Sequence, residues 1–322
     1  MRSAPTALPR CANSTGGHVK KGISYWSFEG GLEGKADIES VLKEAKQKGY
    51  DSVELAAPGG DLTFDVTEKT CQDIAKLAKS IGIELSSVAT GVYWGSSLTS
   101  SKAATRKQAV EYTKKLLHIS RWLGTDAILV IPGAVDVFFD PNSEHVRYDE
   151  CYKRSRDSIK SCVKTAEKLK VAMCLENVWN KFLLSPLEYR DFIDGFKSKY
   201  VKSYFDTGNV RMTGFPEHWI ELLGKNRLGR VHWKDFKFTF YGGGETGETA
   251  AIAEKTRSIA AGSAWAGAYS FCALGSGDLN WKAVMAAFKK VGYNGYVTAE
   301  MLPYRPGQLD EVSRDMNKIL GR

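Results

Sequence analysis

Short apolar runs alternate with longer segments of helical period from Gly22 onward. The apolar runs contain four to seven residues each and are rich in β-branched and aliphatic side chains, as buried parallel strands are. Eight such runs are present: Ile23–Trp26, Ser52–Leu55, Glu84–Ala89, Ala127–Ile131, Val171–Glu176, Tyr200–Asp206, Gly229–Trp233 and Gly295–Glu300. Their number and regular alternation with helices predict an α/β fold, a single-domain (β/α)8 TIM barrel.

The segments between these strands have the period and the stop signals of helices. We predict helices at Ile38–Lys48, Glu68–Ile81, Lys102–Leu123, Tyr148–Leu169, Pro186–Phe196, Pro216–Leu223, Trp281–Val291 and Leu309–Leu320. Glycines follow four of them, at Gly49, Gly82, Gly124 and Gly292, where a helix commonly ends. A doubly wound sheet would also use such elements, but Tyr25–Phe28 stands where that fold carries a glycine-rich phosphate turn. The barrel is therefore favoured.

Two segments depart from the regular alternation. Residues 1–20 mix Arg, Pro, Ser and Asn without an apolar run, and we expect a disordered leader that precedes a barrel over 21–322. Residues 238–278 form a connection of 41 residues, where barrel loops often have about 2 to 6. We interpret it as an insertion after the seventh strand, with a short helix at Glu248–Ala260. It could be a substrate lid or a contact in a homo-oligomer, and the sequence does not rank the two.

Composition excludes several classes of protein. The net charge is +8, but the basic residues are scattered over helix-like segments, so solvated helix faces explain them better than a nucleic-acid partner. No apolar stretch approaches the roughly 18 residues of a membrane span. The six cysteines include no C-x-x-C pair. We expect reduced thiols in a cytoplasmic protein.

Candidate chemistry lies at the ends of the late strands. The fifth, sixth, seventh and eighth predicted strands end in Glu176, Asp206, His232–Trp233 and Glu300. In a barrel these ends meet at one mouth, where reactive groups lie. Three carboxylates held together repel one another unless a cation neutralises them. Carboxylate and imidazole ligands suit one divalent metal ion, namely manganese, cobalt, magnesium or zinc.

The segments around these four residues carry a family resemblance. They are Leu175–Phe182, Phe205–Asn209, Val231–Lys237 and Thr298–Met301. Together they resemble the sugar phosphate isomerase/epimerase family, which is similar to xylose isomerase in fold. The family includes ketose 3-epimerases that act on tagatose, psicose and L-xylulose 5-phosphate. In those enzymes the matching four residues bind one divalent metal, and the two glutamates also serve as acid and base.

The resemblance implies a metal-dependent isomerase or epimerase acting on a ketose or ketose phosphate. Glu176 and Glu300 would move the proton beside the carbonyl through an enediolate, while Asp206 and His232 would be ligands only. Further strand-end and loop residues are candidates for substrate binding: Glu54, Asn177, Trp179, Asn209, Lys234 and Lys237. Free-ketose epimerases usually have His where Asn209 stands and Arg near Lys237, so these departures leave the sugar open.

Other functions use the same type of barrel. A lyase that dehydrates a keto-polyol would use the same metal and glutamates. A sugar-binding barrel without catalytic activity is a further alternative. A nuclease with a multi-zinc cluster needs several strand-end histidines, whereas only His232 of the five histidines has that position. A hydride-shift isomerase needs a second metal with further carboxylates. The expected partner is therefore a small sugar or sugar phosphate, with no membrane.

Overall fold

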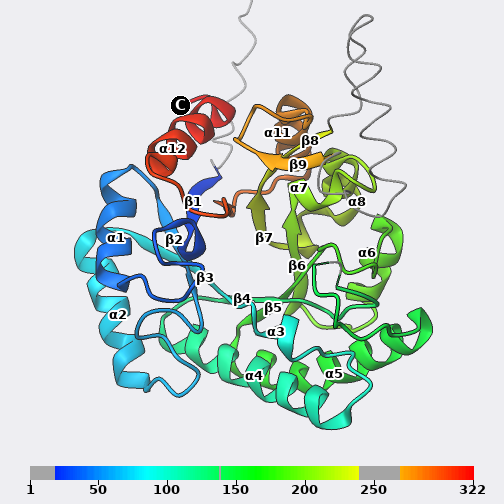
Figure 1. Cartoon of the computed structure of the whole chain (residues 1–322). Coiled ribbons are helices and arrows are strands. Elements are labelled where there is room, and N and C mark those ends of the chain that lie inside the picture. The colour runs from blue at the N-terminus through cyan, green and yellow to red at the C-terminus, as the bar shows by residue number, and fades with distance from the viewer. Residues whose placement is uncertain (1–18, 138, 239–268) are drawn as a thin grey trace, which may run out of the picture.

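Eight parallel strands close into a barrel in a computed structural model that describes residues 19–137, 139–238 and 269–322 (Figure 1). Around the barrel the strands follow the order β1-β10-β7-β6-β5-β4-β3-β2. Their bounds are Lys20–Ser24 (β1), Ser52–Ala56 (β2), Glu84–Ala89 (β3), Ala127–Val130 (β4), Ala172–Glu176 (β5), Val201–Asp206 (β6), Leu228–Trp233 (β7) and Tyr296–Ala299 (β10). The predicted (β/α)8 fold is confirmed.

Helices surround the barrel on its outside (Figure 1). The long ones are Ile38–Gln47 (α1), Glu68–Ile81 (α2), Ala103–Trp122 (α4), Tyr148–Leu169 (α5), Pro186–Asp194 (α6), Pro216–Arg227 (α8), Trp281–Val291 (α11) and Gln308–Leu320 (α12). Short turns Tyr25–Ser27 (η1), Val92–Gly95 (α3) and Thr207–Val210 (α7) follow β1, β3 and β6. Side-chain caps start several helices, as when Asp37 accepts from the Ser40 amide. None of the described helices has the length and apolarity to cross a membrane.

The strands are apolar because both of their faces are covered. Every residue of β2, β4 and β5 is buried. Alternate side chains of a barrel strand fill the interior or contact the helices, so a strand in the middle of this fold has no solvent face. Polar residues inside such strands therefore need partners within the protein.

The two irregular segments are described only in part. Residues 1–18 of the expected leader lie outside the described residues, while β1 already begins at Lys20. The helix expected at Glu248–Ala260 also lies outside the described residues. The described ends of the insertion pair as an antiparallel hairpin of Asp235–Phe238 (β8) and Tyr269–Cys272 (β9). Neither strand is among the eight that the sequence predicts.

A buried carboxylate fastens this hairpin to the barrel. Asp235 Oδ2 accepts hydrogen bonds from the backbone amides of Gly275 and Gly277 at 2.8 and 3.2 Å, and from Trp281 Nε1 at 2.9 Å. A Cβ on Gly277 would lie 2.2 Å from Asp235 Oδ1 and 2.6 Å from the Phe236 carbonyl oxygen. The glycine turn at 275–278 is therefore needed for close approach to Asp235.

The substitution Gly277→Ala should lower the free energy of unfolding by about 1–3 kcal/mol, because the added methyl group has no space. Denaturant unfolding followed by circular dichroism would measure the loss. Gly95→Ala is the control, since a Cβ there meets no atom within 4 Å. Equal stability of the two variants would contradict the proposed close packing of the turn.

Candidate metal centre

Four side chains from four strand ends converge inside the mouth of the barrel. Glu176 ends β5, Asp206 ends β6, His232 lies near the end of β7, and Glu300 directly follows β10. One ligand atom from each lies within 4.8 Å of the others, and all four residues are buried. The structure thus brings together the four residues that the sequence placed at strand ends.

The two carboxylate oxygens of Asp206, at the end of β6, have different roles: one caps a helix and the other faces the cluster. Asp206 Oδ1 accepts from the Asn209 amide at 2.8 Å and caps the short helix α7. The Asn177 side chain pairs with the Asp206 backbone, accepting from its amide at 2.8 Å and donating to its carbonyl at 2.9 Å. These bonds hold the ends of β5 and β6 together and leave Asp206 Oδ2 directed at the cluster.

His232 is oriented by a second carboxylate inside the barrel. Its Nε2 lies 2.9 Å from Glu54 Oε1, and both side chains are fully buried. Because an ionised carboxylate only accepts, Nε2 must carry a proton. The other nitrogen, Nδ1, faces Glu300 Oε2 at 3.5 Å and Glu176 Oε1 at 3.7 Å. A metal bound at Nδ1 would replace any proton there.

The charges of this cluster shift one another's ionisation. Burial alone would lower the pKa of His232, but the Glu54 and Glu300 carboxylates hold it well above its usual value. Burial alone would likewise raise the pKa of Glu54, yet the charge and hydrogen bond of His232 hold it below its usual value. Burial raises the pKa of Glu176. Negative charge is thus concentrated where little water can solvate it.

The donor atoms that face one another are suited to a cation. In the described part of the chain, Asp206 Oδ2, His232 Nδ1 and Glu300 Oε2 are buried without a hydrogen-bond partner. Buried polar atoms are normally satisfied, so three such atoms in one cluster indicate a missing partner. The Lys234 ammonium forms ion pairs with both oxygens, and His232 Nδ1 lies 3.5 Å from that of Glu300. Carboxylate oxygens and an imidazole nitrogen fit a divalent metal.

Two expected substrate contacts have other partners. Glu54 bonds to His232 through one oxygen, and its Oε2 accepts from Ser87 Oγ at 3.0 Å and from the Tyr204 hydroxyl. Both polar ends of the Asn177 amide bond to the Asp206 backbone. The polar groups of Glu54 and Asn177 are therefore engaged with other parts of the protein, and their contact with a substrate stays a prediction.

Asn209 and Trp179 form the wall beside Glu176. Asn209 Nδ2 donates to the Asn177 carbonyl at 3.0 Å and lies 3.5 Å from Glu176 Oε1. Trp179 Nε1 donates to the Asn209 carbonyl at 3.0 Å. The Trp179 ring stacks on Phe271 of β9, with centroids 5.0 Å apart and planes at 12°. The insertion hairpin thereby packs directly against the loop that follows the first ligand.

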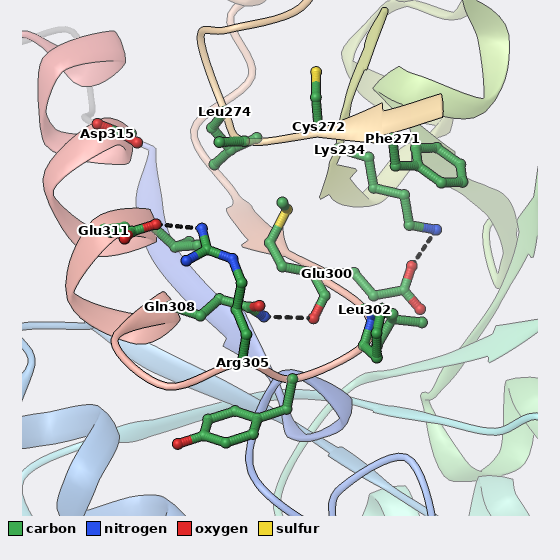
Figure 2. Close-up of a pocket in the computed structure, with 15 residues that line it drawn as sticks. Lys234, Phe271, Cys272, Leu274, Glu300, Leu302, Arg305, Gln308, Glu311 and Asp315 are labelled. Carbon is green, nitrogen blue, oxygen red and sulfur yellow. Dashed lines mark hydrogen bonds and ion pairs between the residues drawn. The ribbon is translucent and has the colours of Figure 1, made fainter. Parts of the chain in front are cut away.

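A cavity of about 290 Å³ opens beside the cluster, between β9 and the segment that joins β10 to α12 (Figure 2). Lys234 and Glu300 form its inner end, and Phe271, Leu302 and Arg305 are among the outer walls. Arg305 is already paired with Glu311. Lys237 is exposed on β8 and does not line this cavity. Lys234 is thus the expected substrate residue that the structure places in the cavity wall.

Sequence reasoning missed the residues that support this site from a distance. Tyr204 and Ser87 form hydrogen bonds with Glu54 inside the barrel. Phe271 belongs to β9, which follows residues 239–268 of the insertion in the sequence, whereas Lys234 precedes them. Tyr204 stands two residues before Asp206 in the same strand, so its side chain shares the inward face of β6. That period-two spacing is the signal that could have identified it.

The fold and the cluster define a (β/α)8 barrel with a carboxylate–imidazole site at the carboxyl ends of its strands. The sequence matches the Xylose isomerase-like TIM barrel family over residues 42–319, and the chain belongs to this family. The resemblance drawn from its motifs is thereby confirmed. A search of curated proteins found no match.

Solved structures share the fold at low sequence identity. D-psicose 3-epimerase with D-tagatose from Clostridium cellulolyticum H10 is 20% identical, with a TM-score of 0.70 over 94% of this chain and 98% of that chain. D-psicose 3-epimerase in the presence of D-fructose is 19% identical, with a TM-score of 0.68 over 94% and 97%. The 3-keto-D-glucoside 4-epimerase from E. coli is 14% identical, with a TM-score of 0.67 over 94% and 100%.

Glu54→Gln should weaken the binding of Mn²⁺ by about 10- to 100-fold, because the charged partner that orients His232 is lost. Isothermal calorimetry of the chelator-treated protein would measure the affinity. Glu84→Gln is the control, since it makes the same change at an exposed carboxylate in β3. Unchanged affinity in Glu54→Gln would show that His232 needs no carboxylate to act as a ligand.

Proposed function

We propose that this protein is a divalent-metal-dependent enzyme that epimerises or isomerises a ketose or ketose phosphate by proton transfer beside the carbonyl. The observation that carries the proposal is the cluster of Glu176, Asp206, His232 and Glu300, whose ligand atoms lie within 4.8 Å of one another. All four side chains would hold the ion, which we expect to be manganese, cobalt, magnesium or zinc.

The two glutamates are the proposed acid and base. When bound, the ion would supply polarisation of the substrate carbonyl, which acidifies the neighbouring C–H. Glu176 and Glu300 come from different sides of the barrel mouth, at the ends of β5 and β10. One carboxylate would take the proton from carbon, and the other would return a proton to the opposite face of the resulting enediolate. Asp206 and His232 would remain ligands.

The cavity and the relatives support a small sugar as the substrate. A volume of about 290 Å³ lies just below the roughly 300–1,000 Å³ of pockets for drug-sized ligands, as suits a small sugar. Phe271, which is stacked on Trp179, lies near Lys234 in the cavity lining, where its ring could face the C–H side of a sugar. Two of the structures that share this fold were solved with the ketoses D-fructose and D-tagatose.

We place the enzyme in the cytoplasm. Cys71, Cys151, Cys162, Cys174 and Cys272 are all free in the structure. Reduced thiols persist in the cytosol, whereas secreted chains tend to pair them.

Incubation with Mn²⁺ and a panel of ketoses and ketose phosphates in deuterated water should place deuterium at the carbon next to the carbonyl. Glu176→Gln and Glu300→Gln should each lower the exchange rate by about 10²–10⁴-fold, because each removes an acid or base. Glu221→Gln, on the exposed face of α8, should exchange at the wild-type rate. Nuclear magnetic resonance would score both label and product. No label from any sugar would reject proton-transfer catalysis, and a dehydrated product would indicate a lyase instead.

At a fixed Mn²⁺ concentration of 100 times the wild-type Kd, the ion should stabilise the folded wild-type protein by about 2.7 kcal/mol, because it binds the folded state. Asp206→Asn should abolish most of that stabilisation, because it removes one ligand charge. The amide can still cap α7 through its oxygen, so the metal-free fold should be kept. Thermal unfolding with and without Mn²⁺ would test this. Equal stabilisation of both proteins would exclude Asp206 as a ligand.

A further inference from the structure

Lys234 extends from the link between β7 and β8 to Glu300, one of the four residues of the cluster (Figure 2). Its Nζ lies 3.0 Å from Asp206 Oδ2 and forms an ion pair with Glu300 Oε2. The side chain is only 12% exposed. The two oxygens are the same atoms that are buried without a hydrogen bond and that would bind a metal. The ammonium group therefore occupies part of the place that the ion requires.

The positive charge of the Lys234 ammonium compensates the negative charge of the two carboxylates, as a bound metal ion would. Buried carboxylates are stabilised by a nearby cation and destabilised when left unpaired. A divalent ion on the same oxygens would repel the ammonium at close range, and that repulsion is weakly screened inside a protein. One of the two cations must move when the other is bound.

Lys234 has space beside it into which its ammonium can move. While Nζ is paired with Asp206 and Glu300 it already lies 5.4 Å from the centroid of the Phe271 ring, and the side chain lines the cavity next to Glu300. Phe271 is stacked on Trp179 and so provides a fixed aromatic surface. The flexible stem of a lysine can turn its ammonium from the carboxylates toward this ring and the cavity.

We propose that Lys234 is a built-in counter-cation of the metal centre, which neutralises Asp206 and Glu300 in the metal-free protein and competes with the ion for their oxygens. This inference rests on the proposed function, because it needs the cluster to bind a metal. Lys234 then lowers the affinity of the cluster for the metal. When displaced, its ammonium would turn further into the cavity that it lines, where it would meet an oxygen of the substrate.

Calorimetric titration of chelator-treated protein with Mn²⁺ at one fixed pH tests the competition. Lys234→Met should bind Mn²⁺ at least about tenfold more tightly than the wild type, because the competing charge is gone. The same variant should be less stable than the wild type without metal, as judged by its Tm, because two carboxylates lose their counter-ion. If Lys234 had only a structural role, its replacement by methionine would weaken both the stability of the protein and its binding of Mn²⁺.

Two further variants keep the test decisive. Lys237→Met removes the same charge from an exposed site on β8 and should bind Mn²⁺ like the wild type. Lys234→Gln keeps a polar head and should behave like Lys234→Met, so a folding defect of one variant does not decide the result. Equal or weaker Mn²⁺ affinity in both Lys234 variants would overturn the competition while leaving the metal site in place. No Mn²⁺ binding by the wild type or any variant would overturn the metal site and this inference together.

Discussion

Four buried carboxylates, Glu54, Glu176, Asp206 and Glu300, share the interior of one barrel mouth, and the rest of the site compensates their charge. Burying ions is costly unless each is paired or hydrogen bonded. Glu54 meets His232, Ser87 and Tyr204, and one oxygen of Asp206 caps α7. The remaining negative charge is directed at the centre of the cluster. The Lys234 ammonium pairs with Asp206 and Glu300 there, and the proposed metal would compensate the same charge.

The parallel barrel makes this concentration of charge possible. Each strand ends at the same rim, so one inward residue from each of several strands reaches a common point. Loop residues then fix the rim, as Asn177 does by pairing with the Asp206 backbone across two strand ends. The four residues of the cluster thus lie at the ends of hydrogen-bonded strands, and side chains of the adjoining loops hold those ends in place.

The sequence predicted the eight strands and the four residues that meet in the cluster because both have a local signature. Apolar runs bounded by helices locate the strands, and a polar residue at the end of such a run is conspicuous at Glu176 or Asp206. The partner of a polar side chain has no such signature. Glu54 was expected to meet substrate, but the closure of the barrel brings it against His232, 178 positions away along the chain. The hairpin of β8 and β9 was missed because its strands are short and pair across the whole insertion.

The insertion is coupled to the metal centre through its described ends. Asp235 holds the glycine turn, and β9 carries Phe271 onto Trp179, which bonds to Asn209 beside Glu176. Phe236 packs edge-on against both aromatic rings, at 5.3 and 5.4 Å between centroids. A shift of this hairpin would move the aromatic surface that faces the Lys234 ammonium. Lys234 in turn pairs with Asp206 and Glu300, so a short chain of packed side chains connects the hairpin with the candidate metal centre.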